Sequence, residues 1–301
     1  MKVIVAGGSG MIGKALTAAL AGQGHTVWVL TRDPGAAKLP EGVLAERWDG
    51  RTAQGWGRLA AEADAIINIS GASIGARPWT NERKRILRAS RVDAGRAIVE
   101  AVRGVAHRPR VVLQIAGVGY YGSQGDQALT ETSPAGSDFL AGVAADWERA
   151  VQPVTDMGVR LVVMRTGVVL SPQGGVLAPF ILQNRLFAGG PLGSGKQWIS
   201  WIHIHDLVRV FQFLLAREDA SGIYNAAAPE PLTNADFGRT VSRKMGRPFW
   251  MPAPAFGLRL VLGEMSTLVL DGQRVLPRRL LELGFHFDFD TLQKALDDLI
   301  K

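Results

Sequence analysis

The chain carries at residues 3–13 the stretch VIVAGGSGMIG, in which a short apolar run leads directly into closely spaced glycines. Residues 3–6 have the length of a buried strand, and residues 11–21 repeat apolar side chains at helical spacing. Glycines end this helix, and residues 26–30 form a second apolar run typical of a strand. A strand–helix–strand unit of this size, about 30 residues, predicts the start of a parallel sheet.

The same alternation of strands and helices continues along the chain. Further strands are predicted at residues 43–48, 65–70, 110–115, 160–165 and 222–226, and helices at 80–102, 139–154 and 206–216. Strands that alternate with helices are typical of a parallel sheet covered on both faces. The sequence therefore predicts an α/β protein, built as a Rossmann doubly wound parallel sheet with a smaller C-terminal substrate-binding region.

The pattern loosens after residue 170, where glycines interrupt a mostly apolar stretch. A strand is expected at residues 198–204, and helices at 234–245, 256–270 and 293–300. We therefore expect a dinucleotide-binding Rossmann domain over residues 1–170, completed by about 197–228. A smaller substrate-binding region would comprise residues 171–196 and 229–301.

The spacing of Gly7, Gly10 and Gly13 indicates what the first unit binds. The first glycine permits a tight turn, and the second lets backbone N–H groups approach a pyrophosphate. The third lets the helix pack closely on the strand. Because the loop lies between a predicted strand and a predicted helix, it predicts a dinucleotide site.

The end of the second strand indicates which dinucleotide is bound. NAD-binding units usually place an acid there for the ribose 2′-hydroxyl, whereas this strand ends Leu30-Thr31-Arg32. The forked guanidinium of Arg32 suits a 2′-phosphate. We therefore expect NADP(H) as the cofactor, with NAD(H) as the alternative.

Composition narrows the classes of protein to which this chain can belong. The 301 residues include no cysteine, which excludes disulfides and thiolate chemistry and is compatible with a reducing cytoplasm. The net charge is +7, but apart from one run at residues 83–88, expected to be a solvated helix face, the basic residues are scattered. Residues 1–6 do not have the pattern of an export signal, and no apolar run has the length of a membrane-spanning helix. We expect a cytoplasmic monomer or homodimer with a small-molecule substrate, and neither a nucleic-acid nor a membrane partner.

Several ordered motifs resemble one known superfamily. They are GGSGMIG at 7–13, INISGA at 67–72, GYYG at 119–122, RTGVVL at 165–170 and WIHIHD at 201–206, followed by LGEM at 262–265, QRVLP at 273–277 and LGF at 283–285. Together they resemble the extended short-chain dehydrogenase/reductase superfamily, and more narrowly its NAD-dependent epimerase-like branch of "epimerase family" proteins. The resemblance covers nearly the whole chain and implies a cleft that holds a substrate against the nicotinamide.

The motifs and the glycine loop together give the expected cofactor site. The expected cofactor-binding residues are Gly7, Gly8, Ser9, Gly10, Met11, Ile12, Gly13, Thr31, Arg32, Ser70, Gly71, Ala72 and Arg165. We expect no metal site. His203 and His205 have no acidic or cysteine partner at ligand spacing, and Asp206 is expected to be a helix N-cap.

The catalytic positions depart from the superfamily pattern, in which a tyrosine precedes a lysine by four residues. Here Phe139 and Val143 occupy those positions, and Ala116 lies where a serine or threonine is expected. Phenylalanine and valine cannot exchange protons, so the usual acid–base mechanism is not available.

Another side chain would therefore have to donate the proton. Tyr121, just beyond the fifth strand, is the first candidate, followed by Tyr120 and Ser123. The favoured interpretation of the two tyrosines is nevertheless that they line and shape the pocket. Trp198 and Trp201 indicate an apolar or aromatic substrate, unless they are core residues. We expect an atypical NADP(H)-dependent oxidoreductase or epimerase-like enzyme acting on a small carbonyl or alcohol. The alternative is a non-catalytic NADP(H)-responsive sensor or scaffold.

Overall fold

The centre of the protein, seen in a computed structural model that describes residues 1–172 and 174–300, is a seven-stranded parallel sheet. The strand order is β12-β7-β5-β4-β1-β2-β3. The strands are β1 (Lys2–Ala6), β2 (Thr26–Thr31), β3 (Val43–Arg47), β4 (Ala65–Asn68), β5 (Val111–Gly117), β7 (Arg160–Thr166) and β12 (Gly222–Ala226). The order reverses at β1, and a crevice at the carboxyl ends of the strands is the usual ligand site of such sheets.

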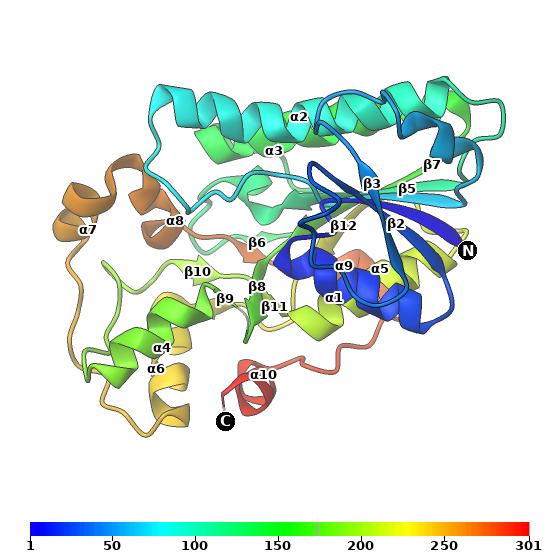
Figure 1. Cartoon of the computed structure of the whole chain (residues 1–301). Helices are drawn as coiled ribbons and strands as arrows, with labels where there is room; N and C mark the ends of the chain where they lie inside the picture. Colours follow the sequence, from blue (N-terminus) through cyan, green and yellow to red (C-terminus); the bar gives the residue numbers. More distant parts are fainter. Residues whose placement is uncertain (173, 301) are drawn as a thin grey trace.

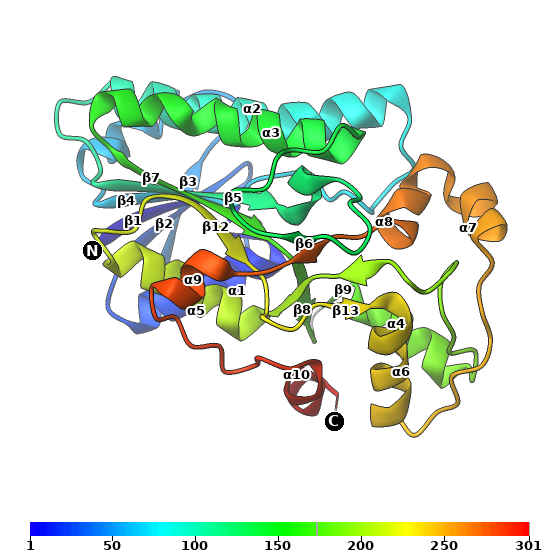
Figure 2. The ribbon, with the colours of Figure 1, turned by 180° about the vertical axis from the view of Figure 1, so that it is seen from behind.

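Helices cover both faces of this sheet, as Figure 1 and the reverse view in Figure 2 show. α2 (Asn81–Arg103) and α3 (Phe139–Val151) lie on one face, and α1 (Met11–Gly22) and α5 (Ile204–Ala216) lie on the other. A Cβ atom on Gly95 would lie 2.8 Å from the Cβ of Ala150, so α2 and α3 pack closely. The α/β fold and its doubly wound sheet are confirmed.

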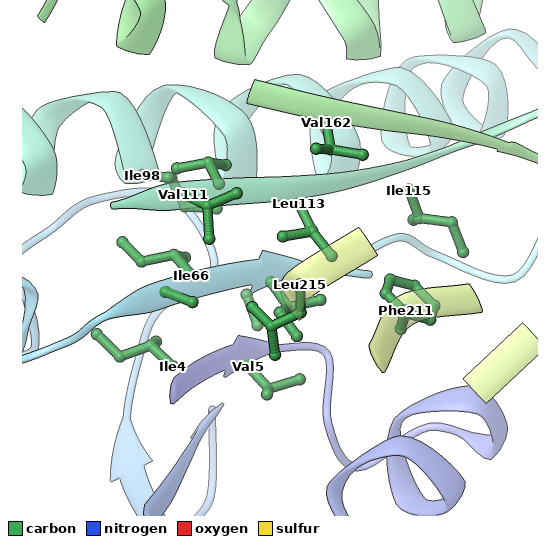
Figure 3. Packing of buried hydrophobic residues seen from close by; sticks show 14 of the residues in the cluster. Ile4, Val5, Ile66, Ile98, Val111, Leu113, Ile115, Val162, Phe211 and Leu215 are labelled. Atoms are coloured by element: carbon green, nitrogen blue, oxygen red, sulfur yellow. The ribbon is translucent and has the colours of Figure 1, made fainter. Parts of the chain in front are cut away.

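Apolar side chains from the strands and helices form one main core. Figure 3 shows Leu113 and Ile115 of β5 beside Leu215 and Phe211 of α5. Leu113, Leu214 and Phe211 are fully buried. Each such side chain contributes roughly 1.5–3 kcal/mol on transfer from water, which explains why the strands are nearly continuous apolar runs.

The remaining elements extend from the carboxyl edge of the sheet and the far end of the chain. They are η1 (Gly57–Ala61), η2 (Val118–Tyr121), β6 (Ala128–Leu129), η3 (Gln152–Met157), β8 (Val168–Ser171), β9 (Gly174–Gly175), α4 (Leu177–Arg185), β10 (Trp198–Ile199), β11 (Trp201–His203), β13 (Leu232–Thr233), α6 (Asn234–Lys244), α7 (Ala255–Leu262), η4 (Gly263–Ser266), α8 (Thr267–Leu270), β14 (Arg274–Val275), α9 (Arg278–Glu282) and α10 (Leu292–Leu299). A second core cluster, including Phe180, Phe237 and Leu296, joins α4, α6 and α10.

Two elements differ from their sequence-based predictions. The expected strand at residues 198–204 is divided, because β10 pairs antiparallel with β13 whereas β11 pairs parallel with β8. The expected helix at residues 256–270 is interrupted at Gly263, whose φ of 55° is rare for other residues. Local hydrophobicity predicted an ordered stretch in each case, but tertiary pairing and one glycine determine where it is broken.

In the basic run at the start of α2, Arg85 and Arg88 are exposed as expected, whereas Arg83 and Lys84 are half-buried. Lys84 forms an ion pair with Glu264 of η4, and Arg88 forms one with Asp146 of α3. These side chains therefore connect α2 to neighbouring elements. Within residues 1–172 and 174–300, no helix has the length and apolar character needed to cross a membrane.

Candidate functional site

A cleft of about 510 Å³ opens at the carboxyl edge of the sheet. It is bounded by the ends of β1, β2, β3 and β4 and by one side of α2. Of the predicted cofactor residues, those that line it are Gly7, Ser9, Gly10, Thr31, Arg32, Ser70, Gly71 and Ala72. The structure therefore brings together residues from three separate strand ends.

The turn after β1 has the geometry that its glycines predict. Gly7 has a φ of +90°, and a Cβ atom there would lie 2.9 Å from the carbonyl carbon of Ile69. At Gly13 a Cβ atom would lie 2.5 Å from the Gly7 oxygen, so α1 packs directly against the turn. Gly10 is the N-cap of α1 and has no side chain to bind the first N–H groups. These N–H groups and the helix dipole favour an anion at this end of the helix.

The ends of β2 and β3 form the side of the cleft that contains Arg32. The turn after β3 places Asp49, Gly50 and Arg51 on the same cleft. The Asp49 carboxylate accepts hydrogen bonds from the backbone N–H groups of Arg51 and Thr52, at 2.8 and 2.9 Å. Although burial alone would raise the pKa of Asp49, these hydrogen bonds lower it. Arg51 is thus a second guanidinium on the cleft beside Arg32.

Sequence reasoning did not identify this second arginine. A usable signal was present, because an acid–glycine–arginine turn directly follows the third predicted strand. The carboxyl ends of parallel strands meet at one edge of a sheet, so residues after β3 belong to the same site as residues after β1 and β2.

The end of β4 supplies the third side of the cleft. The Ser70 N–H donates to Asn68 Oδ1 at 3.1 Å, and the Ala72 N–H donates to Ser90 Oγ of α2 at 3.0 Å. The Ser70 hydroxyl is buried and has no hydrogen-bond partner among the described residues. A buried polar group without a partner is costly, so this hydroxyl is suited to a polar ligand in the cleft.

These features fit a dinucleotide phosphate. The N-terminus of α1 offers backbone donors for a pyrophosphate, and Ser70 Oγ offers an unused polar atom beside it. Arg32, after β2, and Arg51, after β3, both line the cleft on the side where a ribose 2′-substituent is bound in this fold. The residues present thus suit the cofactor that the sequence predicted.

Tyr121, the first candidate proton donor, is fully buried, and its hydroxyl is already used. The hydroxyl donates to Asn225 Oδ1 at 2.7 Å and accepts from Arg165 Nη1 at 3.1 Å. Burial raises the pKa of Tyr121 and outweighs the opposing effect of the Arg165 charge. Tyr121 therefore has neither access to the cleft nor a lowered pKa, and its position does not support a proton-donor role.

Arg165, an expected cofactor contact, belongs to the same internal network. Its Nε and Nη2 atoms donate to the two Glu148 carboxylate oxygens, each at 2.8 Å. The guanidinium carbon lies 3.3 Å from the centre of the Tyr120 ring, and the side chain is only 1% exposed. Burial alone would lower the pKa of Arg165, but the hydrogen bonds and charge of Glu148, together with Tyr121, raise it. Arg165 thus links β7 to α3 and does not line the cleft, so its position does not support a cofactor contact.

The other two candidates, Tyr120 and Ser123, are less buried than Tyr121. The Tyr120 ring packs against both Arg165 and Tyr121, and Ser123 lies exposed in the loop after η2. Phe139 packs against Trp79, with ring centres 5.2 Å apart, and the Lys84 Nζ atom lies 5.2 Å from its ring centre. The position that the superfamily gives to its tyrosine is thus an apolar wall.

His203, His205 and Asp206 lie at the start of α5, where His203 and Asp206 accept hydrogen bonds from the backbone. His203 is the N-cap of α5, since its Nδ1 accepts from the His205 N–H at 3.1 Å. The expectation that Asp206 is the cap is therefore wrong. Asp206 lies in the first turn, where its carboxylate accepts from the N–H groups of Asp288 and Phe289. The described part of the chain contains no group of three or more His, Asp or Glu residues placed to hold a metal ion.

The two tryptophans expected near the substrate both form hydrogen bonds within the protein. Trp201 is fully buried and donates from its indole nitrogen to the Glu230 carbonyl, so it is a core residue. Trp198 donates to the Asp126 carboxylate at 2.9 Å and lies beneath Arg274. The aromatic wall found at this edge of the sheet is formed instead by Trp79 and Phe139.

The fold and the cleft together define a dinucleotide-binding protein, and comparison with known sequences gives its family. Residues 3–227 match the NAD dependent epimerase/dehydratase family, and residues 253–299 match a domain of unknown function, DUF1731. The chain belongs to the NAD dependent epimerase/dehydratase family. The resemblance read from the motifs is confirmed, and so is its characteristic C-terminal module.

Individual relatives match over the whole chain. An epimerase family protein of Staphylococcus epidermidis is 37% identical over 303 residues, which cover 100% of this chain and 99% of the relative. A chloroplastic epimerase family protein SDR39U1 homolog of Arabidopsis thaliana is 36% identical, covering 98% of this chain and 86% of its own length. The human epimerase family protein SDR39U1, solved with NADPH, has a TM-score of 0.88 and 34% identity, with 99% of each chain covered.

Proposed function

We propose that this protein binds NADP(H) in the cleft at the carboxyl edge of its sheet and acts as an atypical oxidoreductase on a small carbonyl or alcohol. The observation that carries the proposal is the combination of Arg32 and Arg51 on one cleft wall with the buried, unpaired Ser70 hydroxyl. NADPH in the related human protein supports the same choice of cofactor. A cytoplasmic location stays a prediction, supported by the lack of cysteine.

Different residues of the chain bind and orient different parts of the cofactor. The N-terminus of α1 holds the pyrophosphate, and the two arginines hold the 2′-phosphate. Ser90 fixes the backbone of Ala72, so that the Ser70–Ala72 segment presents a rigid surface along the cleft. The nicotinamide, when bound, supplies or accepts a hydride. Tyr121 and Tyr224 are buried, and no lysine lies four residues after any tyrosine of this chain, so the proton comes from solvent or from the substrate.

The cofactor assignment predicts a selective effect of Arg32→Ala. Loss of a charge-assisted hydrogen bond costs about 1.5–3 kcal/mol, so the Kd for NADPH should rise roughly 10-fold or more. The Kd for NADH should change much less, because NADH has no 2′-phosphate. Titration of the reduced nicotinamide fluorescence measures both constants.

Lys38→Ala provides the control, since Lys38 is an exposed cation in the same loop and does not line the cleft. It should leave both constants near the wild-type values. Equal weakening of NADPH and NADH in Arg32→Ala, or the same weakening in Lys38→Ala, would refute the 2′-phosphate assignment.

A second candidate function is a non-catalytic, NADP(H)-responsive sensor. The absence of a proton-transferring side chain at Phe139 and Val143 favours it. It predicts cofactor binding without turnover, and a partner protein whose affinity changes with NADPH. Substrate-dependent oxidation of NADPH across a panel of carbonyl compounds would exclude this candidate.

A further inference from the structure

Two arginines of α2 hold the loop that leads from the cleft to the start of this helix. Arg83 donates from Nη2 to the Ser73 carbonyl, and Arg91 donates from Nη2 to the Ala72 carbonyl at 3.1 Å. They lie eight residues apart, near one face of the helix. Ala72 itself lines the cleft, so Arg91 lies behind one of its walls, whereas Arg83 holds the next residue, at the edge of that wall.

Neither guanidinium has an acidic partner. Within the described ranges, no Asp or Glu forms an ion pair with Arg83 or Arg91. Arg91 is only 5% exposed, and burial lowers its pKa to about 10, with the charge of Arg83 acting in the same direction. Two neighbouring cations without an anion are costly in a partly buried place, so the corner has an uncompensated positive charge.

The same corner contains buried hydrogen-bond donors that have no acceptor. The Nε of Arg83 is buried, and no partner for it lies among the residues described. The indole nitrogen of Trp147 is also buried without a hydrogen-bond partner among the described residues. The Trp147 ring centre lies 4.8 Å from the Arg91 guanidinium carbon. Most buried donors in folded proteins are paired, so the unpaired Arg83 Nε indicates a missing acceptor at this arginine.

Apolar rings form the neighbouring surface. Trp79 immediately precedes the N-cap of α2 and packs edge-on against Phe139, in the first turn of α3. Lys84, next to Arg83, lies over the Phe139 ring and forms an ion pair with Glu264. The charge of Lys84 is therefore already compensated within the protein. Arg83 is therefore the half-buried cation that remains for a ligand beside the aromatic pair.

From this juxtaposition we infer that the substrate carries a carboxylate, bound at Arg83 beside the Trp79–Phe139 pair. The planar guanidinium matches a carboxylate, and the rings suit an apolar or aromatic body attached to it. Arg91 lies behind the loop, where its charge adds to the attraction without contacting the ligand. The inference rests on the proposed function, because it assigns a substrate class to the surface that adjoins the cofactor cleft at Ala72.

The test compares an acid with its neutral counterpart of the same shape. Calorimetric titration of 3-phenylpropanoate and 3-phenylpropanamide uses the full-length protein in the presence of saturating NADPH. We expect the acid to bind at least 10-fold more tightly than the amide, with an affinity that falls as salt is raised. Equal affinities, or no binding of either compound, would overturn the inference.

Variants assign the effect to Arg83. Arg83→Gln should abolish the preference for the acid, and Arg83→Lys should restore part of it, since lysine keeps the charge but loses the fork. Arg85→Gln is the matched control, because Arg85 is exposed on the same turn of α2 and should behave as wild type. Loss of the preference in Arg85→Gln, or its persistence in Arg83→Gln, would contradict the assignment.

The same experiment separates two kinds of failure. If NADPH does not bind to the wild-type protein, the proposed function fails. If NADPH binds but the acid and the amide do not differ, only the substrate class fails. Should Arg83→Gln not fold, the acid–amide comparison in the wild-type protein and in Arg83→Lys still decides the outcome.

Discussion

The Tyr121 hydroxyl joins parts of the chain that are far apart in sequence. It connects η2 to Asn225 of β12 and to Arg165 of β7. Asn225 in turn donates from Nδ2 to the Leu276 carbonyl, and its N–H donates to the Glu131 carboxylate. A hydroxyl at the centre of such a buried network contributes to stability rather than to proton transfer.

Tyr121→Phe should therefore destabilise the fold without abolishing cofactor binding. The change leaves Asn225 Oδ1 and Arg165 Nη1 without a buried partner, which should lower the free energy of unfolding by about 1–3 kcal/mol. Urea denaturation measures this loss, and NADPH affinity should stay within about twofold of wild type. Tyr120→Phe is the control, since no partner of the Tyr120 hydroxyl lies among the described residues. Unchanged stability with lost turnover in Tyr121→Phe would instead support the original catalytic assignment.

At the level of elements, the first strand–helix–strand unit could be predicted because its signals are local. Apolar runs and glycines fix β1, α1 and β2 without help from the rest of the chain. β10 and β11 could not be separated from sequence, because only their different partner strands divide one apolar run. The same distinction applies to the site. The glycine loop and Arg32 are local signals, whereas Arg51 and Arg83 gain their roles from packing that brings distant segments together.

Two helices of the C-terminal module differ sharply in how they pack. Leu296 of α10 is fully buried against α6, whereas α7 lies entirely within the described residues and buries none of its side chains. Leu260 of α7 is 85% exposed. The module therefore owes its docking to α10 and to contacts such as Lys84–Glu264, and not to α7.

Matched substitutions in the two helices test this difference. Leu296→Ala should cost about 2–5 kcal/mol, because it removes buried methyl groups and leaves a cavity. Leu260→Ser should change the free energy of unfolding by no more than about 0.5 kcal/mol, since its side chain already contacts water. Thermal and urea unfolding of both variants provide the measurement. A large loss in Leu260→Ser would mean that α7 is covered in solution.

At the scale of the whole molecule, one buried histidine links the sheet core to the C-terminal helix. His203 caps α5 through Nδ1, and its Nε2 lies 3.3 Å from the Asp298 carboxylate of α10. Its ring stacks on Phe289, with ring centres 3.8 Å apart. Burial lowers the pKa of His203, and the charge of His205 acts in the same direction. The charges of Asp298 and Asp206 act in the opposite direction but do not outweigh the burial. The capping role requires an unprotonated Nδ1, which agrees with the lowered pKa.

The lowered pKa predicts how stability depends on pH. As the pH falls below the ordinary histidine pKa of about 6.5, the unfolded chain binds a proton at this position before the folded chain does. The stabilisation is therefore present above this pH and is lost as the pH falls from about 7 to about 5, at no more than about 1.4 kcal/mol per pH unit for one group. His203→Asn keeps an acceptor for the helix cap but does not titrate, so its stability should depend less on pH over this window, from a lower value at neutral pH.

Urea denaturation at a series of pH values measures both slopes. His107→Asn is the control, because His107 is an exposed histidine in the loop before β5, and its slope should match that of the wild type. If His203→Asn instead keeps the full wild-type slope, the acid sensitivity of the fold arises elsewhere. In that case the contact between His203 and Asp298 would stabilise the protonated ring in the folded state as well as water does in the unfolded chain.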